Sequence, residues 1–433
     1  MTALPAALRL PRLTGYKWVI LAVGLASQTA ISGVRQGLPS LAPALRDTYA
    51  LSLTQLGVVL ASINVGIVLT LFGWGVLADR IGERPVLAVG LGAAAAALVG
   101  AALAPTFGWL LIALLVAGMA GASAIGASGR AVMGWFERSE RGMALGVRQT
   151  GVPLGGGLAA LALPLVVAVY DLHAALFLVA VGCAAAAIVS WRWMRDPPPP
   201  SQGRLVVVSP PPHRDRRIWR LGLGSSFVVI AQGAMFGFLV VFLHDEHGWS
   251  VAAASGALAA LYVGGAVARV AAGVWSDRID ERVAPLRRLT ALSSVFLLSA
   301  AVLGGVGAPT VLLLPVLLAG GVLAASWNGL SLTAATEMSG RERAGTAIGV
   351  QNTILNGAGA IAPVAFASAV VATSWPASWA MLAVCQLAGV AVLAPLVAEE
   401  RGRREVRRAH QRAQHERRTC NASRVTVTTR RAT

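Results

Sequence analysis

Charged residues are scarce in this sequence, and their scarcity limits the kind of protein it can be. They make up 13% of the 433 residues, where about a quarter is usual in a soluble protein, while hydrophobic residues make up 56%. The mean hydropathy is +0.68. Disordered chains are rich in charge and poor in apolar residues, so this composition excludes disorder. It also argues against a soluble globular fold.

Cysteine is scarce as well. The chain has three, Cys183, Cys385 and Cys420, which are too few for a disulfide scaffold and lack the spacing of a metal site. We find neither the glycine-rich P-loop that holds nucleotide phosphates nor a pairing of a nucleophile with a base. The sequence therefore predicts no cofactor and no metal, no use of ATP, and no enzymatic activity.

Long apolar segments dominate the chain instead. A helix needs roughly 20 apolar residues to cross a bilayer core about 30 Å thick. Twelve segments meet this requirement, and we expect each to be a transmembrane helix, called spans one to twelve below. They lie near 17–37, 54–76, 85–104, 108–130, 142–168, 172–193, 218–243, 251–275, 289–307, 309–333, 345–372 and 377–397.

The net charge of +17 suggests a nucleic-acid partner at first, but the positions of the charges argue against one. All but four of the 36 Lys and Arg residues fall in the two termini and in the loops on the same side as the termini. The exceptions are Arg35, Arg46, Arg148 and Arg269. Basic loops stay on the cytoplasmic side of a membrane. We therefore expect an integral protein of the cell (inner) membrane with both termini cytoplasmic.

Two segments break the pattern of spans and divide the chain. A proline-rich basic stretch at 196–217 reads as a cytoplasmic linker between a bundle at 1–195 and a bundle at 218–398. Residues 399–433 form a basic tail, expected to be disordered or to lie on anionic lipid.

The two halves of the chain repeat each other. Residues 75–84 read GVLADRIGER and residues 273–282 read GVWSDRIDER, with seven of ten positions identical. Residues 144–150 read ALGVRQT, and residues 347–353 read AIGVQNT. The two pairs have similar offsets, 198 and 203, and lie at corresponding spans. They predict two six-helix halves of the same topology, with a site near the midplane where the halves meet.

The loop after span two resembles the signature of the major facilitator superfamily, a G-x-x-x-D-R-x-G-x-R pattern. The resemblance covers about residues 15–398, although Glu83 stands where a basic residue is usual. It implies an all-α membrane protein with twelve transmembrane helices in two pseudo-symmetric six-helix bundles. Arg269, Gly273 and Asp277 also resemble a pattern in carriers of monocarboxylates and of nitrate. Leu71 replaces the paired arginine of the nitrate carriers.

Two arginines lie deep within the expected spans. At 1.5 Å per residue, Arg269 is about 12 Å from the loop residue Asp277, and Arg148 is about 9 Å inside span five. Arg35 lies near the outer end of span one, where we expect it to snorkel to the interface. No carboxylate falls in the middle of any span. Because a buried unpaired charge is costly, an anionic substrate, such as a carboxylate or sulfonate, is the natural counter-charge.

Amide side chains accompany the arginines. The resemblance implies that spans five and eight pack against each other, which would bring Arg148 and Arg269 to one seam. The amides expected to bind substrate with them, or else to form hydrogen bonds between helices, are Gln28, Gln149, Gln232, Asn328, Gln351, Asn352 and Asn356.

A second group of residues is expected to control access. In the family that the chain resembles, the carboxylate of the signature loop latches the cytoplasmic side by accepting hydrogen bonds at a helix N-terminus. Arg130, at the inner end of span four, is the expected partner of Asp79. The predicted gating residues are Gly75, Asp79, Arg80, Arg84, Arg130, Asp277 and Arg278.

These observations predict a secondary transporter that moves a small organic anion by alternating access. Its partners would be the solute and the lipid bilayer, with no nucleic acid, and the protein would act as a monomer. Coupling remains open between symport of a proton with the anion, exchange of anions and plain facilitation. The alternatives are an exporter of drugs or other metabolites, which usually needs a buried acid, and a membrane receptor or sensor.

Overall fold

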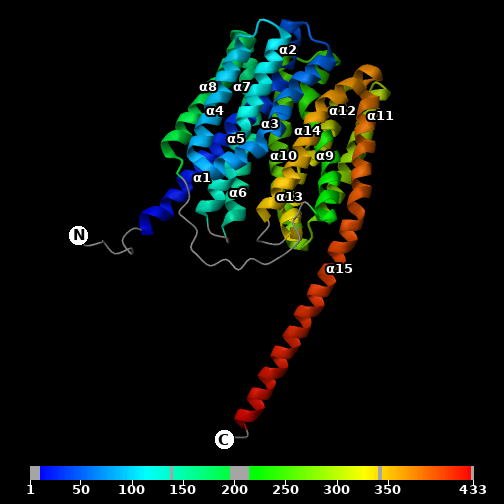
Figure 1. The fold of residues 1–433 in the computed structure, drawn as a ribbon. Helices are drawn as coiled ribbons and strands as arrows, with labels where there is room; N and C mark the ends of the chain where they lie inside the picture. Colours follow the sequence, from blue (N-terminus) through cyan, green and yellow to red (C-terminus); the bar gives the residue numbers. More distant parts are fainter. Residues whose placement is uncertain (1–9, 137–139, 196–213, 340–343, 431–433) are drawn as a thin grey trace, which may run out of the picture.

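Twelve helices long and apolar enough to cross a membrane make up almost all of the molecule (Figure 1). The computed structural model describes residues 10–136, 140–195, 214–339 and 344–430, and these residues contain no strand. The N-terminal end of α1 and the C-terminal end of α15 lie on the same side of the molecule. We call this the termini side and the opposite one the far side. The number of spans and the all-α class predicted from the sequence are confirmed.

The first half of the chain forms one bundle and the second half another. The first contains α1 (Leu10–Gly37), α2 (Ala42–Tyr49), α3 (Leu53–Ile81), α4 (Glu83–Ala102), α5 (Phe107–Trp135), α6 (Arg141–Gln149), α7 (Gly151–Val169) and α8 (Leu172–Trp193). The second contains α9 (Arg216–Asp245), α10 (Val251–Ile279), α11 (Val283–Gly305), α12 (Thr310–Ala325), α13 (Trp327–Ser339), α14 (Ala344–Ala372) and α15 (Trp375–Arg430).

Polar side chains set the start of several helices on the far side. The hydroxyls of Ser52, Thr106 and Ser250 and the carboxylate of Asp171 each accept a backbone N–H from the first turn of the following helix. Such caps satisfy donors that a helix cannot pair internally. Ser52 and Ser250 stand at the same offset as the repeated loops, so the repeat extends to the way α3 and α10 begin.

Spans five and ten are each interrupted, which the sequence analysis did not foresee. Span five breaks at Thr150 between α6 and α7. Pro153 lies four residues after Gln149 and cannot donate the hydrogen bond that would close this turn. Span ten breaks at Ser326, whose hydroxyl and backbone N–H both turn back to the carbonyl of Leu323. Side-chain bonding of this kind competes with the helix ladder.

Two segments differ from expectation in length. Span one continues through a turn at Leu38–Leu41 into α2, so the candidate span reaches Tyr49 rather than ending near 37. The tail, expected without regular structure or on lipid, continues α15 as a helix to Arg430 (Figure 1). Between Gly402 and the end of this helix the sequence has no proline or glycine, which would interrupt a helix, and it is rich in Arg, a good helix former. The linker expected at 196–217 lies largely outside the described residues.

The two bundles meet along two pairs of helices, α3 with α14 and α7 with α10. Glycine allows close approach at both. A Cβ at Gly57 of α3 would lie 2.8 Å from the carbonyl oxygen of Pro363 in α14. A Cβ at Gly156 of α7 would lie 2.8 Å from the ring of Tyr262 in α10. Small residues at such contacts are typical of packing in membranes, where helix association depends on close van der Waals contact.

Within the first bundle, the crossing of α3 and α5 gives a test of this packing. A Cβ at Gly118 would lie 2.2 Å from the carbonyl oxygen of Ile63. We expect Gly118→Ala to lower the stability by about 1–3 kcal/mol through overpacking. Gly92→Ala is the matched control, because a Cβ at Gly92 meets nothing within 4 Å. Thermal melting of the purified protein checks this, and equal melting temperatures for the two variants would contradict it.

Candidate functional site

A cavity of about 190 Å³ lies between the two bundles, and both halves of the chain line it. We call it the central cavity. Of the nine residues predicted to bind substrate, eight lie on its wall: Gln28, Arg148, Gln149, Gln232, Arg269, Asn328, Asn352 and Asn356. The volume is below the roughly 300 Å³ at which drug-sized pockets begin, so it suits a small solute.

Arg148 is held almost entirely by the protein. Its side chain is 5% exposed, and its Nε donates to the hydroxyl of Ser128 at 2.9 Å. Its Nη2 donates to Gln28 Oε1 and to the carbonyl of Ile125, both at 2.8 Å. Its Nη1 has a longer contact of 3.5 Å with Gln149. Most of its donors are therefore used in joining α1, α5 and α6.

Gln351, the ninth predicted residue, takes part in packing instead. It is fully buried off the cavity wall, and its Nε2 donates to the hydroxyl of Ser331 at 2.8 Å. This bond repeats the one between Arg148 and Ser128, because both residues shift by the same 203 positions between the halves. The repeat therefore preserves a contact between neighbouring spans while the charge occurs in the first half alone.

Arg269 is more open than Arg148. Its side chain is half-buried, and its Nε and Nη2 both donate to the carbonyl of Ala325, at 3.4 and 3.2 Å. Ala325 is the last residue of α12, at the interruption of span ten. The break thus supplies an acceptor for the arginine, as unwound carbonyls do in other transporters. This single carbonyl leaves other donors of the guanidinium available to a solute.

Arg35 is a third arginine on the cavity wall, which corrects the expectation that it snorkels to the interface. The physical reason is the length of span one. Because the candidate span continues through α2 to Tyr49, Arg35 lies farther from its end than in a span ending near 37. Among the described residues, its guanidinium has no hydrogen-bond or ion-pair acceptor.

The amides around the cavity are oriented by their neighbours. The indole of Trp327 can only donate, and it donates to Gln232 Oε1 at 2.6 Å, which fixes that amide. Asn356 also lines the wall and donates to the backbone of Asn352 at 2.8 Å. The sequence analysis missed Gln36 and Asn64 on the same wall. Both are polar residues within expected spans, and that signal could have identified them.

On the far side, contacts between the bundles close the cavity. The hydroxyl of Tyr262 donates to the backbone carbonyl of Gln36 at 2.9 Å, and its ring stacks on Phe236 with centroids 4.6 Å apart. Nearer the surface, Arg46 of α2 forms an ion pair with Asp245 of α9. Each of these two polar contacts joins one half of the chain to the other.

The predicted gating residues of the first half lie on the termini side. Arg130 donates to Glu83 Oε1 at 2.8 Å and to the carbonyl of Ala78. The side chain of Asp79 is outside the described residues, so its pairing with Arg130 stays a prediction. Arg84 donates to the carbonyl of Trp191 at 2.7 Å and lies over its ring, which ties α4 to α8.

The remaining gating candidates of this half make no specific contact with the described residues that bears on the prediction. Arg80 is exposed, and Gly75 is half-buried, with nothing within 4 Å of the position of a Cβ. Their roles stay predictions.

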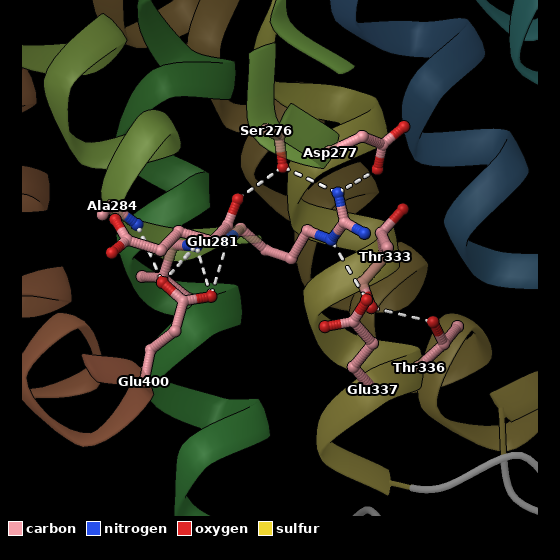
Figure 2. A network of polar contacts seen from close by, with 10 residues as sticks. Ser276, Asp277, Glu281, Ala284, Thr333, Thr336, Glu337 and Glu400 are labelled. Carbon is pink, nitrogen blue, oxygen red and sulfur yellow. Dashed lines mark hydrogen bonds and ion pairs between the residues drawn. The ribbon is translucent and has the colours of Figure 1, made fainter. Parts of the chain in front are cut away.

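The corresponding loop of the second half is held within its own bundle (Figure 2). Arg282 donates to Ser276, to Asp277 and, at 3.0 Å, to Glu337 of α13. Glu400 of α15 accepts the backbone N–H groups at the start of α11, at 2.6–3.1 Å. A carboxylate is stabilised at this positive end of a helix. Arg278, also predicted to gate, is exposed.

This architecture agrees with the comparison to known families. The family model described as Major Facilitator Superfamily matches residues 24–363, well over half of the chain. The chain belongs to the major facilitator superfamily. Accordingly, it is an integral multi-pass transporter and not an enzyme.

Individual members of the superfamily resemble it to different degrees. An uncharacterized MFS-type transporter of Mycobacterium tuberculosis, Rv2994, is 34% identical over 406 residues, covering 92% of this chain and 91% of the relative. A protein of Bacillus subtilis named hexuronate transporter is 25% identical over 263 residues, which are 58% of this chain and 62% of that protein.

Solved structures show the same fold. An inward-facing, unoccupied bacterial homologue of the human lysosomal transporter Spinster has a TM-score of 0.68 at 18% identity, over 89% of this chain and 96% of that one. The nucleoside transporter NupG, in a mutant form, has a TM-score of 0.68 at 16% identity, over 87% and 99%.

The contacts of the two predicted arginines imply that they differ in their effect on stability. Arg148→Ala would leave the acceptors on Gln28, Ser128 and Ile125 without their donor, and each buried unpaired group costs about 1–3 kcal/mol. We expect Arg148→Ala to lower the melting temperature of the ligand-free protein clearly. Arg269→Ala, which releases one carbonyl, should lower it much less. Thermal melting in detergent tests this, and the reverse order would contradict it.

Proposed function

We propose that this protein is a secondary active transporter that moves a small organic anion by alternating access. The observation that carries the proposal is the central cavity. Three arginines line it, while no aspartate or glutamate occurs among the described residues of its wall. A guanidinium binds a carboxylate through two parallel hydrogen bonds. We assign Arg269 as the main contact of the anion, with Gln232, Asn328 and Asn352 orienting the solute.

The relatives support anionic chemistry. The Bacillus subtilis relative is named for hexuronate, and a hexuronate is a sugar carrying a carboxylate. The similarity to it covers 58% of this chain, so it supports a carboxylate without selecting this sugar acid. An exporter of cations is the less favoured alternative, because a cationic solute would meet three arginines in the cavity.

The orientation and the coupling are parts of the same proposal. We place the termini side in the cytoplasm of a cell whose inner membrane holds the protein, because the basic loops lie on that side. Both halves of one chain form the cavity, so we propose that it works as a monomer. A proton would cross with the anion as symport, and the described wall offers no carboxylate to bind that proton.

The charge of Arg269 provides the test of this function. We expect a carboxylate or sulfonate to stabilise the wild-type protein in a thermal-shift panel that includes glucuronate, with glucose as the neutral counterpart. Arg269→Ala should abolish this stabilisation. Arg269→Lys should keep part of it with at least tenfold weaker binding, because lysine retains the charge but loses the planar fork.

Uptake into liposomes by the reconstituted protein then shows whether binding leads to transport. If cationic or neutral solutes alone stabilise the wild type, or if Arg269→Ala binds the anion as tightly as wild type, the anion proposal is wrong.

The proposed alternating access gives a second test, at the loop of the first half. Asp79→Asn should reduce uptake of the bound anion several-fold without weakening equilibrium binding, because it removes a contact of one conformation rather than of the site. Asp277→Asn should be milder, since that carboxylate is 70% exposed and paired within its own loop. Unchanged uptake by Asp79→Asn would show that the carboxylate is no latch.

A further inference from the structure

The three arginines of the central cavity have different numbers of hydrogen-bond acceptors within the protein. This difference indicates how many anionic groups the solute carries. Arg148 has acceptors from Gln28, Ser128 and Ile125. Arg269 has one carbonyl, that of Ala325. Arg35 has no hydrogen-bond acceptor in the described part of the chain. Two of the three guanidiniums therefore have donors left for a ligand.

The two open arginines lie at different depths and on different halves of the chain. Arg35 belongs to α1, and the next residue, Gln36, binds the hydroxyl of Tyr262 where the cavity is closed on the far side. Arg269 is seven residues after Tyr262 along α10, which is about 10 Å along the helix axis. Arg35 is thus at the closed end of the cavity, and Arg269 is nearer the termini side.

The positive charges of Arg35 and Arg269 lie toward opposite ends of the cavity, and both need a counter-charge. A single carboxylate on Arg269 would leave Arg35 without a counter-charge, and an unpaired charge at membrane depth is costly. No acidic residue on the described wall can take this role. A ligand with an anionic group at each end would neutralise both arginines at once.

We propose that the solute of this transporter is a small dicarboxylate, with one carboxylate on Arg269 and the second on Arg35. The assignment rests on the proposed organic-anion function and narrows it. It makes Arg35 a determinant of specificity: it selects dianions over monoanions, while Arg269 is needed for both. Because the two arginines come from different bundles, the dicarboxylate would also join the halves.

The experiment compares ligands of one shape and different charge. Straight-chain dicarboxylates of three to six carbons are each paired with their monoamide, which replaces one carboxylate by a neutral group of similar size. Binding to the purified full-length protein is measured by thermal shift and calorimetry. We expect one dicarboxylate to bind at least tenfold more tightly than its monoamide.

Arg35→Gln assigns the second carboxylate. We expect this variant to bind the dicarboxylate no more tightly than the monoamide, while its affinity for the monoamide stays that of wild type. Arg192→Gln is the control, because it removes the same charge at the end of α8, where the guanidinium lies by the ring of Trp193. The control should keep the wild-type preference, and melting of ligand-free Arg35→Gln shows that it is folded.

The outcomes separate this proposal from the function on which it rests. Equal affinity of wild type for a dicarboxylate and its monoamide, or an Arg35→Gln variant that keeps the preference, overturns the dicarboxylate assignment while the anion function stands. If Arg35→Gln weakens the binding of both ligands equally, Arg35 does not recognise the second carboxylate, and the dicarboxylate assignment is again wrong. If no carboxylate binds wild type, the organic-anion function falls and the assignment with it.

Discussion

A guanidinium inside a membrane must find acceptors, and much of this structure follows from that requirement. Arg148 finds them in side chains and carbonyls of its own bundle. Arg269 finds one where span ten is interrupted, because a helix that breaks releases a carbonyl. In the proposed function, the solute supplies acceptors for the guanidinium donors that have no partner in the protein. The number of acceptors that the protein provides therefore distinguishes an arginine with a structural role, Arg148, from an arginine that has donors left for a solute, Arg269.

The interruptions of spans five and ten serve this arrangement. Each break lies next to a residue that an arginine of the central cavity contacts: Thr150 follows Gln149, and Ser326 follows Ala325. Irregular backbone in a membrane is tolerated where it is buried or lines a cavity. Four of the other spans, α3, α5, α8 and α10, begin at side-chain caps on the far side, and glycines allow close contacts between helices. The regular helices thus support the two interrupted spans, one in each bundle, at the site.

Hydropathy and charge were enough to predict the twelve spans, because the thickness of the bilayer sets their length. They also predicted eight of the residues that line the central cavity, since an uncompensated polar residue within a span tends to face the interior. The depth of Arg35 and the packing role of Gln351 could not be predicted in this way. The first depends on where span one ends, and the second on which face of α14 meets Ser331. Neither is encoded in local composition.

The repeat of the chain carries a last consequence. The first half has arginine at Arg148 where the second has Gln351, and the second half has Arg269 where the first has Leu71. The two-fold pseudo-symmetry is therefore broken twice, in opposite senses. A dimer built from two copies of either half would duplicate one arginine and lack the other. The two halves therefore contribute different side chains to the central cavity, so the two ends of a bound solute meet different surroundings even if the solute itself is symmetric.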